Sequence, residues 1–170
     1  AGSFVAGIFA HLPSVLACSL SNANSYARLA PSSWVGIYPC LGTRNREAAV
    51  RLCPREQTAD GENTNASIEY RLADGTANPY LALAALVHAG MDGMRRDLAT
   101  PGDVQVDPAT LSEDARRKLG LDPLPQSARE TLDRAAALKD WFGETFDAAF
   151  RAARENDIAD AERLGDSYAQ

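Results

Sequence analysis

Apolar positions recur with helical spacing in the first part of the chain, where residues 1–27 carry no charged side chain. One helical face would carry Phe4, Ile8, His11, Leu12 and Val15. This spacing predicts a buried helix over 4–17, which Pro13 is expected to bend or restart. The Ser/Asn-rich stretch that follows, 19–26, has the composition of a loop.

Two strand-like runs come next, at 34–40 and 48–53. The polar, turn-rich segment 57–66 is expected to be an exposed loop. Residues 67–72 then alternate, which predicts a strand with one buried face and one face that carries functional groups. The buried face would hold Ile68, Tyr70 and Leu72, and the other face Ser67, Glu69 and Arg71.

The clearest helix follows a turn at Asp74-Gly75. Asn78 is a good N-cap and Pro79 suits the first helical position. Residues 80–91 are apolar almost all round, which predicts a fully buried helix. Gly90 and Gly93 are expected to mark its end.

The second half of the chain reads as helical. A short helix is expected near 113–119, and Ser127 with Glu130 forms a capping box for a helix running to about Lys139. A last amphipathic helix would place Phe142, Phe146, Phe150 and Ala153 on its inner stripe. The order of elements predicts an α+β fold, with antiparallel strands in the first half, packed with helices, and a helical C-terminal region.

Composition and charge narrow the class of protein. A chain of 170 residues suits one domain, and a net charge of -6 argues against nucleic acid or an anionic membrane as a partner. The uncharged opening lacks the basic start of a signal peptide, and Pro13 with the Ser/Asn cluster interrupts any membrane span. Three widely spaced cysteines are expected to be reduced, buried thiols of a cytoplasmic protein.

Arginine is concentrated in the predicted strand region. Between residues 28 and 71 the chain has no lysine and six arginines, namely Arg28, Arg44, Arg46, Arg51, Arg55 and Arg71. Arginine grips carboxylate or phosphate with two hydrogen bonds, and Glu69 beside such groups is what a metal–nucleotide site requires. However, arginine outnumbers lysine 15 to 2 in the whole chain. The alternative interpretation is that Glu69 and Arg71 form a plain ion pair on a solvated surface. Taken alone, the spacing of these residues favours the surface ion pair over the metal–nucleotide site.

Four sequence motifs favour the metal–nucleotide site over the surface ion pair. They are "FVAGIFAHLPSVLA" (4–17), "NSYARLAP" (24–31), "NREAAVRL" (45–52) and "IEYRLADGTANPYLALAALVHAGMDGM" (68–94). In this order they resemble the C-terminal part of the glutamine synthetase catalytic domain. The resemblance is dense from Phe4 to Gly93 and weaker afterwards, where "LPQSARETLDRAAAL" is similar to the closing helices. It implies the guanido kinase-like fold of that family, with a catalytic strand/helix part over 1–94 and a helical part over 95–170.

The resemblance also implies an activity. The family joins glutamate to ammonia with ATP and Mg²⁺ or Mn²⁺, through γ-glutamyl phosphate. Arg28 and Asn24 would bind glutamate, with Arg28 on its carboxylate. Arg46 would stabilise the transferring phosphoryl group and contact ATP.

The strand residues receive the remaining implied roles. Arg51 would hold ATP phosphates and Glu69 would ligate a divalent metal. Arg71 would act at the acyl phosphate or substrate carboxylate. Phosphoryl transfer is mostly positioning and charge neutralisation, so arginines and metal ions suit it.

Two departures from the family pattern bear on the substrates. Where ammonia-using members carry a glutamate, this chain has Trp34 or a neighbour, and no acid lies between Arg28 and Arg44. The segment "PSSWVGIYPCLGTRNREA" instead resembles the divergent branch that includes γ-glutamyl-amine ligases and related proteins. An indole in place of a carboxylate would make the amine pocket more apolar and would attract an alkylammonium. Ser67 stands where the family often has arginine, so ATP binding would either rest more on Arg51 or be weakened.

The resemblance covers only part of what the reaction needs. The other metal-binding glutamates, a histidine motif and an N-terminal domain lie upstream of the matched region in the family. We therefore expect a C-terminal fragment that is inactive alone and joins a ring oligomer when full-length. Two alternatives stay open: an ordinary ammonia-dependent glutamine synthetase, and a catalytically dead relative with a structural or regulatory role.

Overall fold

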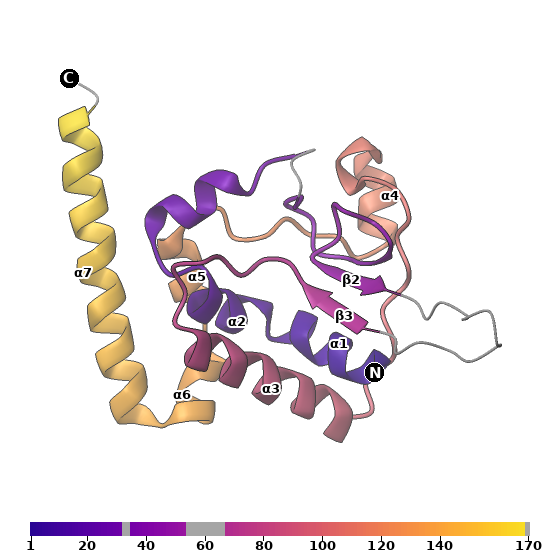
Figure 1. Ribbon diagram of the computed structural model, residues 1–170, viewed down its shortest axis with the longest axis horizontal. Coiled ribbons are helices and arrows are strands. Elements are labelled where there is room, and N and C mark those ends of the chain that lie inside the picture. The colour runs from indigo at the N-terminus through magenta and orange to yellow at the C-terminus, as the bar shows by residue number, and fades with distance from the viewer. Residues whose placement is uncertain (32–34, 54–66, 169–170) are drawn as a thin grey trace, which may run out of the picture. The chain divides into compact units, whose positions relative to one another are not determined.

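The computed structural model describes residues 1–31, 35–53 and 67–168, and side chains up to 165. The chain forms two compact units. We call them the helical unit (Ala1–Arg28, Ala73–Ala99 and Pro125–Gln170) and the sheet unit (Leu29–Leu72 and Thr100–Leu124). Their segments interleave along the chain (Figure 1).

The N-terminal apolar stretch forms two helices, α1 (Gly2–Ala10) and α2 (Leu12–Ser19), as expected from Pro13. The helices bend by 80° at His11, and Pro13 lies in the first turn of α2, where its missing N–H is tolerated. The predicted loop over 19–26 is wrong for residues 23–26, which belong to a 3₁₀ helix, η1 (Ala23–Arg28).

The same two helices are the most apolar in the part of the chain that the structure describes. No helix there has, by itself, the length and apolar composition needed to cross a bilayer. Helices α1 and α2 reach that threshold only when they are taken together as a bent pair.

Helix α3 (Pro79–Arg95) begins where the sequence predicts. The Asn78 side chain accepts hydrogen bonds from the backbone N–H groups of Tyr80 (3.0 Å) and Leu81 (3.3 Å), and Pro79 follows it. The predicted end is wrong, because the helix runs through Gly90 and Gly93 to Arg95. These glycines instead allow α1 to pack closely on α3.

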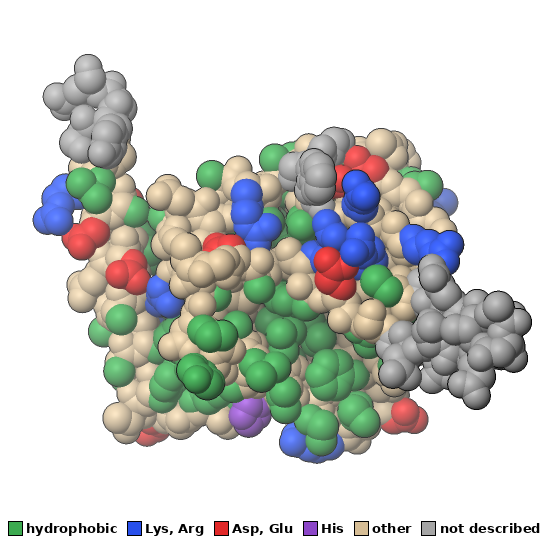
Figure 2. Space-filling model, viewed as in Figure 1, with side chains coloured by type: hydrophobic (Ala, Val, Ile, Leu, Met, Phe, Trp, Pro, Cys, Tyr) green, Lys and Arg blue, Asp and Glu red, His purple; other side chains and the backbone are tan. Residues whose placement is uncertain are grey.

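The prediction that α3 is buried all round is also wrong. Its buried residues are small: Ala82, Ala85, Ala89, Gly90 and Gly93. Its large apolar side chains are exposed on another face, and Tyr80 is 83% exposed. This face carries Tyr80, Leu83, Val87, Met91 and Met94. Figure 2 shows hydrophobic side chains gathered over this helix. The helix uses its small residues for close packing, so the bulky ones point away.

The C-terminal segment forms α5 (Ala128–Arg134), α6 (Ala137–Phe142) and α7 (Glu144–Tyr168). Ser127 caps α5 by accepting from the Glu130 N–H at 3.1 Å, which confirms the predicted start. The predicted run to Lys139 is wrong, because the helix breaks after Arg134. Gly143, at a φ of 86°, separates α6 from α7.

An aromatic row packs α6 and α7 into the core of the helical unit. Phe142 and Phe146 lie 4.8 Å apart between ring centroids, and Phe146 stacks on Phe150 at 5.6 Å. Ala153 is exposed, so its predicted inward position is wrong, and Ile158 continues the buried face. The buried cluster contains Ala17, Cys18, Ala85, Leu132, Ala135, Leu138, Phe150 and Ile158.

The sheet unit holds three strands, β1 (Leu41–Thr43), β2 (Val50–Cys53) and β3 (Ser67–Tyr70), in the order β1-β2-β3. β2 and β3 pair antiparallel, as expected, but β1 and β2 are parallel, so the sheet is mixed. The strand predicted at 34–40 is wrong over 35–40, because β1 begins only at Leu41. Segment 57–66 and Trp34 lie outside the described residues.

The remaining elements of the sheet unit are short. They are η2 (Pro108–Thr110) and α4 (Glu113–Lys118), which confirms the short helix predicted near 113–119. The buried cluster of this unit is Cys40, Ala48, Val104 and Leu121. The predicted buried face of β3 is confirmed only in part: Leu72, just beyond it, is fully buried, but Ile68 is 39% exposed.

Candidate active site

A glutamate held between two arginines forms the centre of the candidate site. Arg51 on β2 and Glu69 on β3 are directly opposite in the antiparallel register, and their side chains form an ion pair. Arg71 Nη1 lies 3.4 Å from the other carboxylate oxygen of Glu69. Arg71 is 11% exposed and Glu69 41%, so this is a partly buried cluster and not a plain surface pair.

Strand geometry explains this convergence. Residues two apart share one face of a strand, which places Glu69 and Arg71 together, and the β2–β3 register brings Arg51 across. The backbone N–H of Arg71 also donates to the Ala49 carbonyl at 2.9 Å, which continues the pairing past the end of β3. Figure 2 shows basic and acidic side chains gathered over these strands.

Arg46 lies in the turn between β1 and β2, and this turn is held by Asn45. The Asn45 side-chain amide donates to the carbonyls of Val104 (2.7 Å) and Val106 (3.0 Å), and its oxygen accepts from the Glu47 N–H at 3.0 Å. The turn therefore needs the asparagine that precedes Arg46, a role that sequence reasoning missed. The sequence signal that could have indicated this turn was an Asn directly before two charged residues, outside any predicted helix.

Glu47 is a second site residue that sequence reasoning missed. Its Oε2 atom is buried and has no hydrogen-bond partner among the described residues. Burial raises the pKa of Glu47, the nearby charge of Asp107 adds to the rise, and Arg71 opposes it. Arg71 thus interacts electrostatically with Glu47 as well as pairing with Glu69.

The raised pKa of Glu47 predicts an effect on stability. A carboxyl group whose pKa is higher in the folded state favours folding when protonated, and it costs stability as pH rises through that pKa. Glu47→Gln should therefore raise the free energy of unfolding at pH 7 by about 1 kcal/mol, because a neutral amide costs less to desolvate than a charged carboxylate. The gain should shrink as pH falls and the glutamate becomes protonated. Urea unfolding at several pH values measures it.

Glu113→Gln is the matched control for this substitution. Glu113 is exposed on α4, and its change should stay within about 0.5 kcal/mol at every pH. A loss of stability in Glu47→Gln at pH 7 would show that the carboxylate makes a favourable contact in the folded protein.

The two remaining predicted residues in the described part belong to the helical unit. Arg28 ends η1, and its Nη2 donates to the Ala73 carbonyl at 3.1 Å. Asn24 is exposed on η1 and borders two cavities, of about 350 and 460 Å³, between η1 and α7. The sheet unit thus brings together Arg51, Glu69 and Arg71, with Arg46 in an adjoining turn, while Arg28 and Asn24 are placed within the other unit.

The described residues do not complete a metal site. A carboxylate such as Glu69 suits Mg²⁺ or Mn²⁺, which prefer oxygen ligands. Within the described ranges, however, no group of three or more His, Cys, Asp or Glu side chains could hold a metal ion. Glu69 therefore fits the role of one ligand, and the others would have to come from elsewhere.

The sequence belongs to the glutamine synthetase catalytic-domain family, whose profile matches residues 1–168. The chain is 38% identical over 132 residues to the gamma-glutamylpolyamine synthetase of Streptomyces coelicolor, covering 78% of this chain and 28% of that protein. It is 34% identical over 146 residues to the glutamine synthetase of Pyrococcus furiosus, covering 84% and 32%.

A solved structure supports the same assignment. A crystal structure of a novel glutamine synthase homolog matches with a TM-score of 0.74 and 32% identity, over 94% of this chain and 34% of that one. The α+β fold is therefore that of the family. The chain spans about a third of the length of the relatives it matches.

Proposed function

We propose that the full-length protein is an ATP-dependent ligase that joins glutamate to an organic amine through γ-glutamyl phosphate. The observation that carries this proposal is the Arg51–Glu69–Arg71 cluster, in which a carboxylate suited to a cation lies between two groups suited to anions. A phosphoryl-transfer site needs this alternation of charge, because its phosphates and metal ions neutralise each other.

The individual roles are those that the resemblance to the family implies, and the charges of the residues suit them. Arg51 and Arg46 would hold ATP phosphates and the transferring phosphoryl group. Arg71 would bind the acyl phosphate or substrate carboxylate, and Glu69 would supply one ligand to Mg²⁺ or Mn²⁺. Arg28 and Asn24 on η1 would bind glutamate. The remaining ligands and the rest of the active site would come from outside this chain segment.

The choice of an amine over ammonia rests on the segment that follows η1 in the sequence. Residues 29–43 contain no acid that could take a proton from ammonium, and Trp34 offers an aromatic face instead. An indole attracts alkylammonium groups more than it helps deprotonate ammonium. That a relative at 38% identity is named as acting on polyamines supports this choice.

Steady-state assays of the full-length protein with ammonium, alkylamines and polyamines test the proposal. We expect kcat/KM for at least one amine to exceed that for ammonium by tenfold or more. Trp34→Glu should shift the ratio toward ammonium, while Trp141→Phe, in the helical core, should leave the ratio unchanged. A clear ammonium preference in the natural protein would contradict the amine assignment.

An ammonia-dependent glutamine synthetase is the second candidate. It is favoured by the matches to enzymes named as glutamine synthetases at 33–36% identity. The assay above separates it from the amine ligase. Absence of phosphate release with every nitrogen donor would instead indicate a relative without catalysis.

A further inference from the structure

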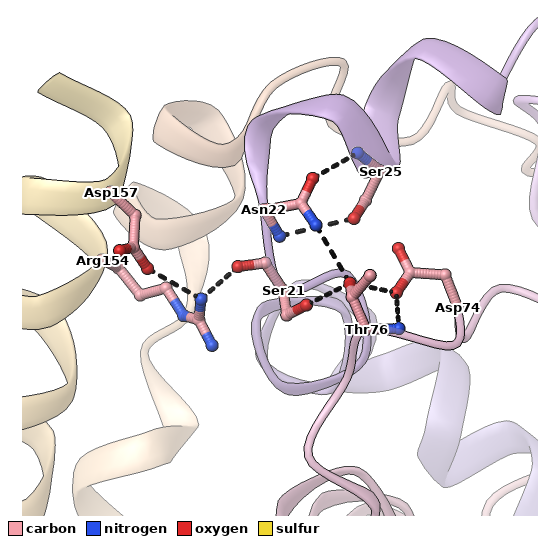
Figure 3. Close-up of polar contacts among 7 residues, drawn as sticks. All are labelled: Ser21, Asn22, Ser25, Asp74, Thr76, Arg154 and Asp157. Carbon is pink, nitrogen blue, oxygen red and sulfur yellow. Dashed lines mark hydrogen bonds and ion pairs between the residues drawn. The ribbon is translucent and has the colours of Figure 1, made fainter. Parts of the chain in front are cut away.

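A polar network ties the corner between α2 and η1 to the turn that precedes α3 (Figure 3). The Ser21 and Thr76 hydroxyls lie 2.5 Å apart, and the Asn22 side-chain amide donates to the Thr76 hydroxyl at 3.0 Å. Thr76 in turn donates to the Asp74 carboxylate through its hydroxyl (2.6 Å) and its N–H (2.9 Å). Every donor in this chain of contacts finds its acceptor within the helical unit.

Both ends of η1 are attached to this turn. At its start, the Ser25 N–H donates to the Asn22 side-chain oxygen at 3.1 Å, and the Asn22 N–H donates to the Ser25 hydroxyl at 3.3 Å. At its end, Arg28 donates to the carbonyl of Ala73 at 3.1 Å. Burial acts to raise the pKa of Asp74, but hydrogen bonds from Ser25 and Thr76 and the charge of Arg28 lower it overall. A carboxylate held ionised in this way keeps the turn and η1 together.

The C-terminal helix reaches the same corner through Arg154. Its Nη1 donates to the backbone carbonyl of Ser21 and to the Asp157 carboxylate at 3.0 Å. Its guanidinium also lies over the Phe150 ring, 5.1 Å from the centroid, and the side chain is only 22% exposed. The Ser21 carbonyl follows the end of α2, where a cation is favoured by the helix dipole and by carbonyls that lack helical partners.

We propose that Arg154 is a positioning residue for the substrate carboxylate site, acting from α7 through Ser21, Thr76 and Asp74 on Arg28. This inference rests on the proposed function, because it assigns Arg28 to glutamate. Arg154 itself contacts no reacting group. It holds the corner between α2 and η1 at the point where the hydrogen-bond network attaches to the start of η1. Its loss would therefore let Arg28 and Asn24 shift.

The matched comparison is Arg154→Ala against Arg163→Ala in the full-length protein. Arg163 lies on the same helix but is 77% exposed and pairs with Asp160 on its own helix. Arg154→Ala should raise KM for glutamate about tenfold, because small displacements of a positioning group weaken substrate binding. Its kcat and its KM for ATP should change less than threefold. Arg163→Ala should match the natural protein.

Two further variants distinguish a loss of positioning from a general folding defect. Arg154→Lys retains a cation that can reach one carbonyl, so it should recover part of the glutamate affinity. Thr76→Val removes the hydroxyl that joins Ser21, Asn22 and Asp74, and should raise KM for glutamate in the same direction without touching α7. Amide hydrogen exchange should report faster exchange at residues 22–28 in Arg154→Ala and Thr76→Val.

The outcomes separate this inference from the proposed function. A natural protein without glutamate-dependent phosphate release would overturn the proposed function, and this inference with it. An active natural protein in which Arg154→Ala keeps its KM for glutamate, or raises KM for ATP equally, would overturn only the positioning role. Unchanged exchange at 22–28 would also overturn it, whatever the kinetics.

Discussion

Gly93→Ala is expected to lower the free energy of unfolding by about 3 kcal/mol, at the upper end of the cost of overpacking. A Cβ at Gly93 would lie 2.1 Å from the Ser3 carbonyl oxygen and 2.6 Å from the Gly7 Cα. Both are backbone atoms of α1, so relief requires the two helices to separate. Helix propensity alone would favour alanine by about 1 kcal/mol, which the clash should exceed. Urea unfolding of the chain measures the change.

Two glycines provide controls for this prediction. Gly165 lies in α7, and a Cβ added there would meet nothing within 4 Å, so Gly165→Ala should stabilise by about 0.5–1 kcal/mol. At Gly90 a Cβ would meet the ring of Phe4, which can rotate, so Gly90→Ala should cost less than Gly93→Ala. A stabilised Gly93→Ala would contradict the close packing of α1 on α3.

Glu69→Gln is expected to reduce activity of the full-length protein by about a thousandfold, the scale on which a charge in a phosphoryl-transfer site acts. The amide keeps the shape of the side chain but removes the charge that Arg51 and Arg71 share. The two arginines would then repel each other and lose their alignment. Phosphate release with glutamate and an amine measures the activity, and the Mn²⁺ concentration for half-maximal rate should rise.

Glu113→Gln is again the matched control, since Glu113 is exposed and pairs on α4 with Arg117. It should leave activity within twofold. Glu69→Gln should also unfold within about 1 kcal/mol of the natural protein, because exposed and half-exposed ion pairs contribute little to stability. Near-normal activity in a folded Glu69→Gln protein would remove Glu69 from the site.

Local rules succeeded at three places where the deciding contacts lie within a few residues. The start of α3 at Asn78-Pro79 and the start of α5 at Ser127 depend on a side chain reaching an N–H two or three residues ahead. The break between α1 and α2 follows from the ring of Pro13. The motif order also identified the family, because several spaced patterns in one register are rarely matched by chance.

The remaining features depended on partners distant in the sequence. The composition of α3 could not show that α1 would pack on its glycines, and so it could not show which face would be left exposed. The parallel pairing of β1 with β2 and the extent of β1 depend on backbone partners that no local pattern specifies.

Within the candidate site, the sequence by itself determined that Glu69 and Arg71 share one strand face, because alternation is a local property of an extended chain. Only the tertiary structure decided that Arg51 lies opposite Glu69, that Asn45 holds the turn of Arg46, and that the Glu47 carboxylate lies near Arg71 with one oxygen buried. Each of these depends on strand register or on a segment far away along the chain. Such contacts form only when the chain folds, since their free energy comes from burial and pairing and not from the propensity of any single segment.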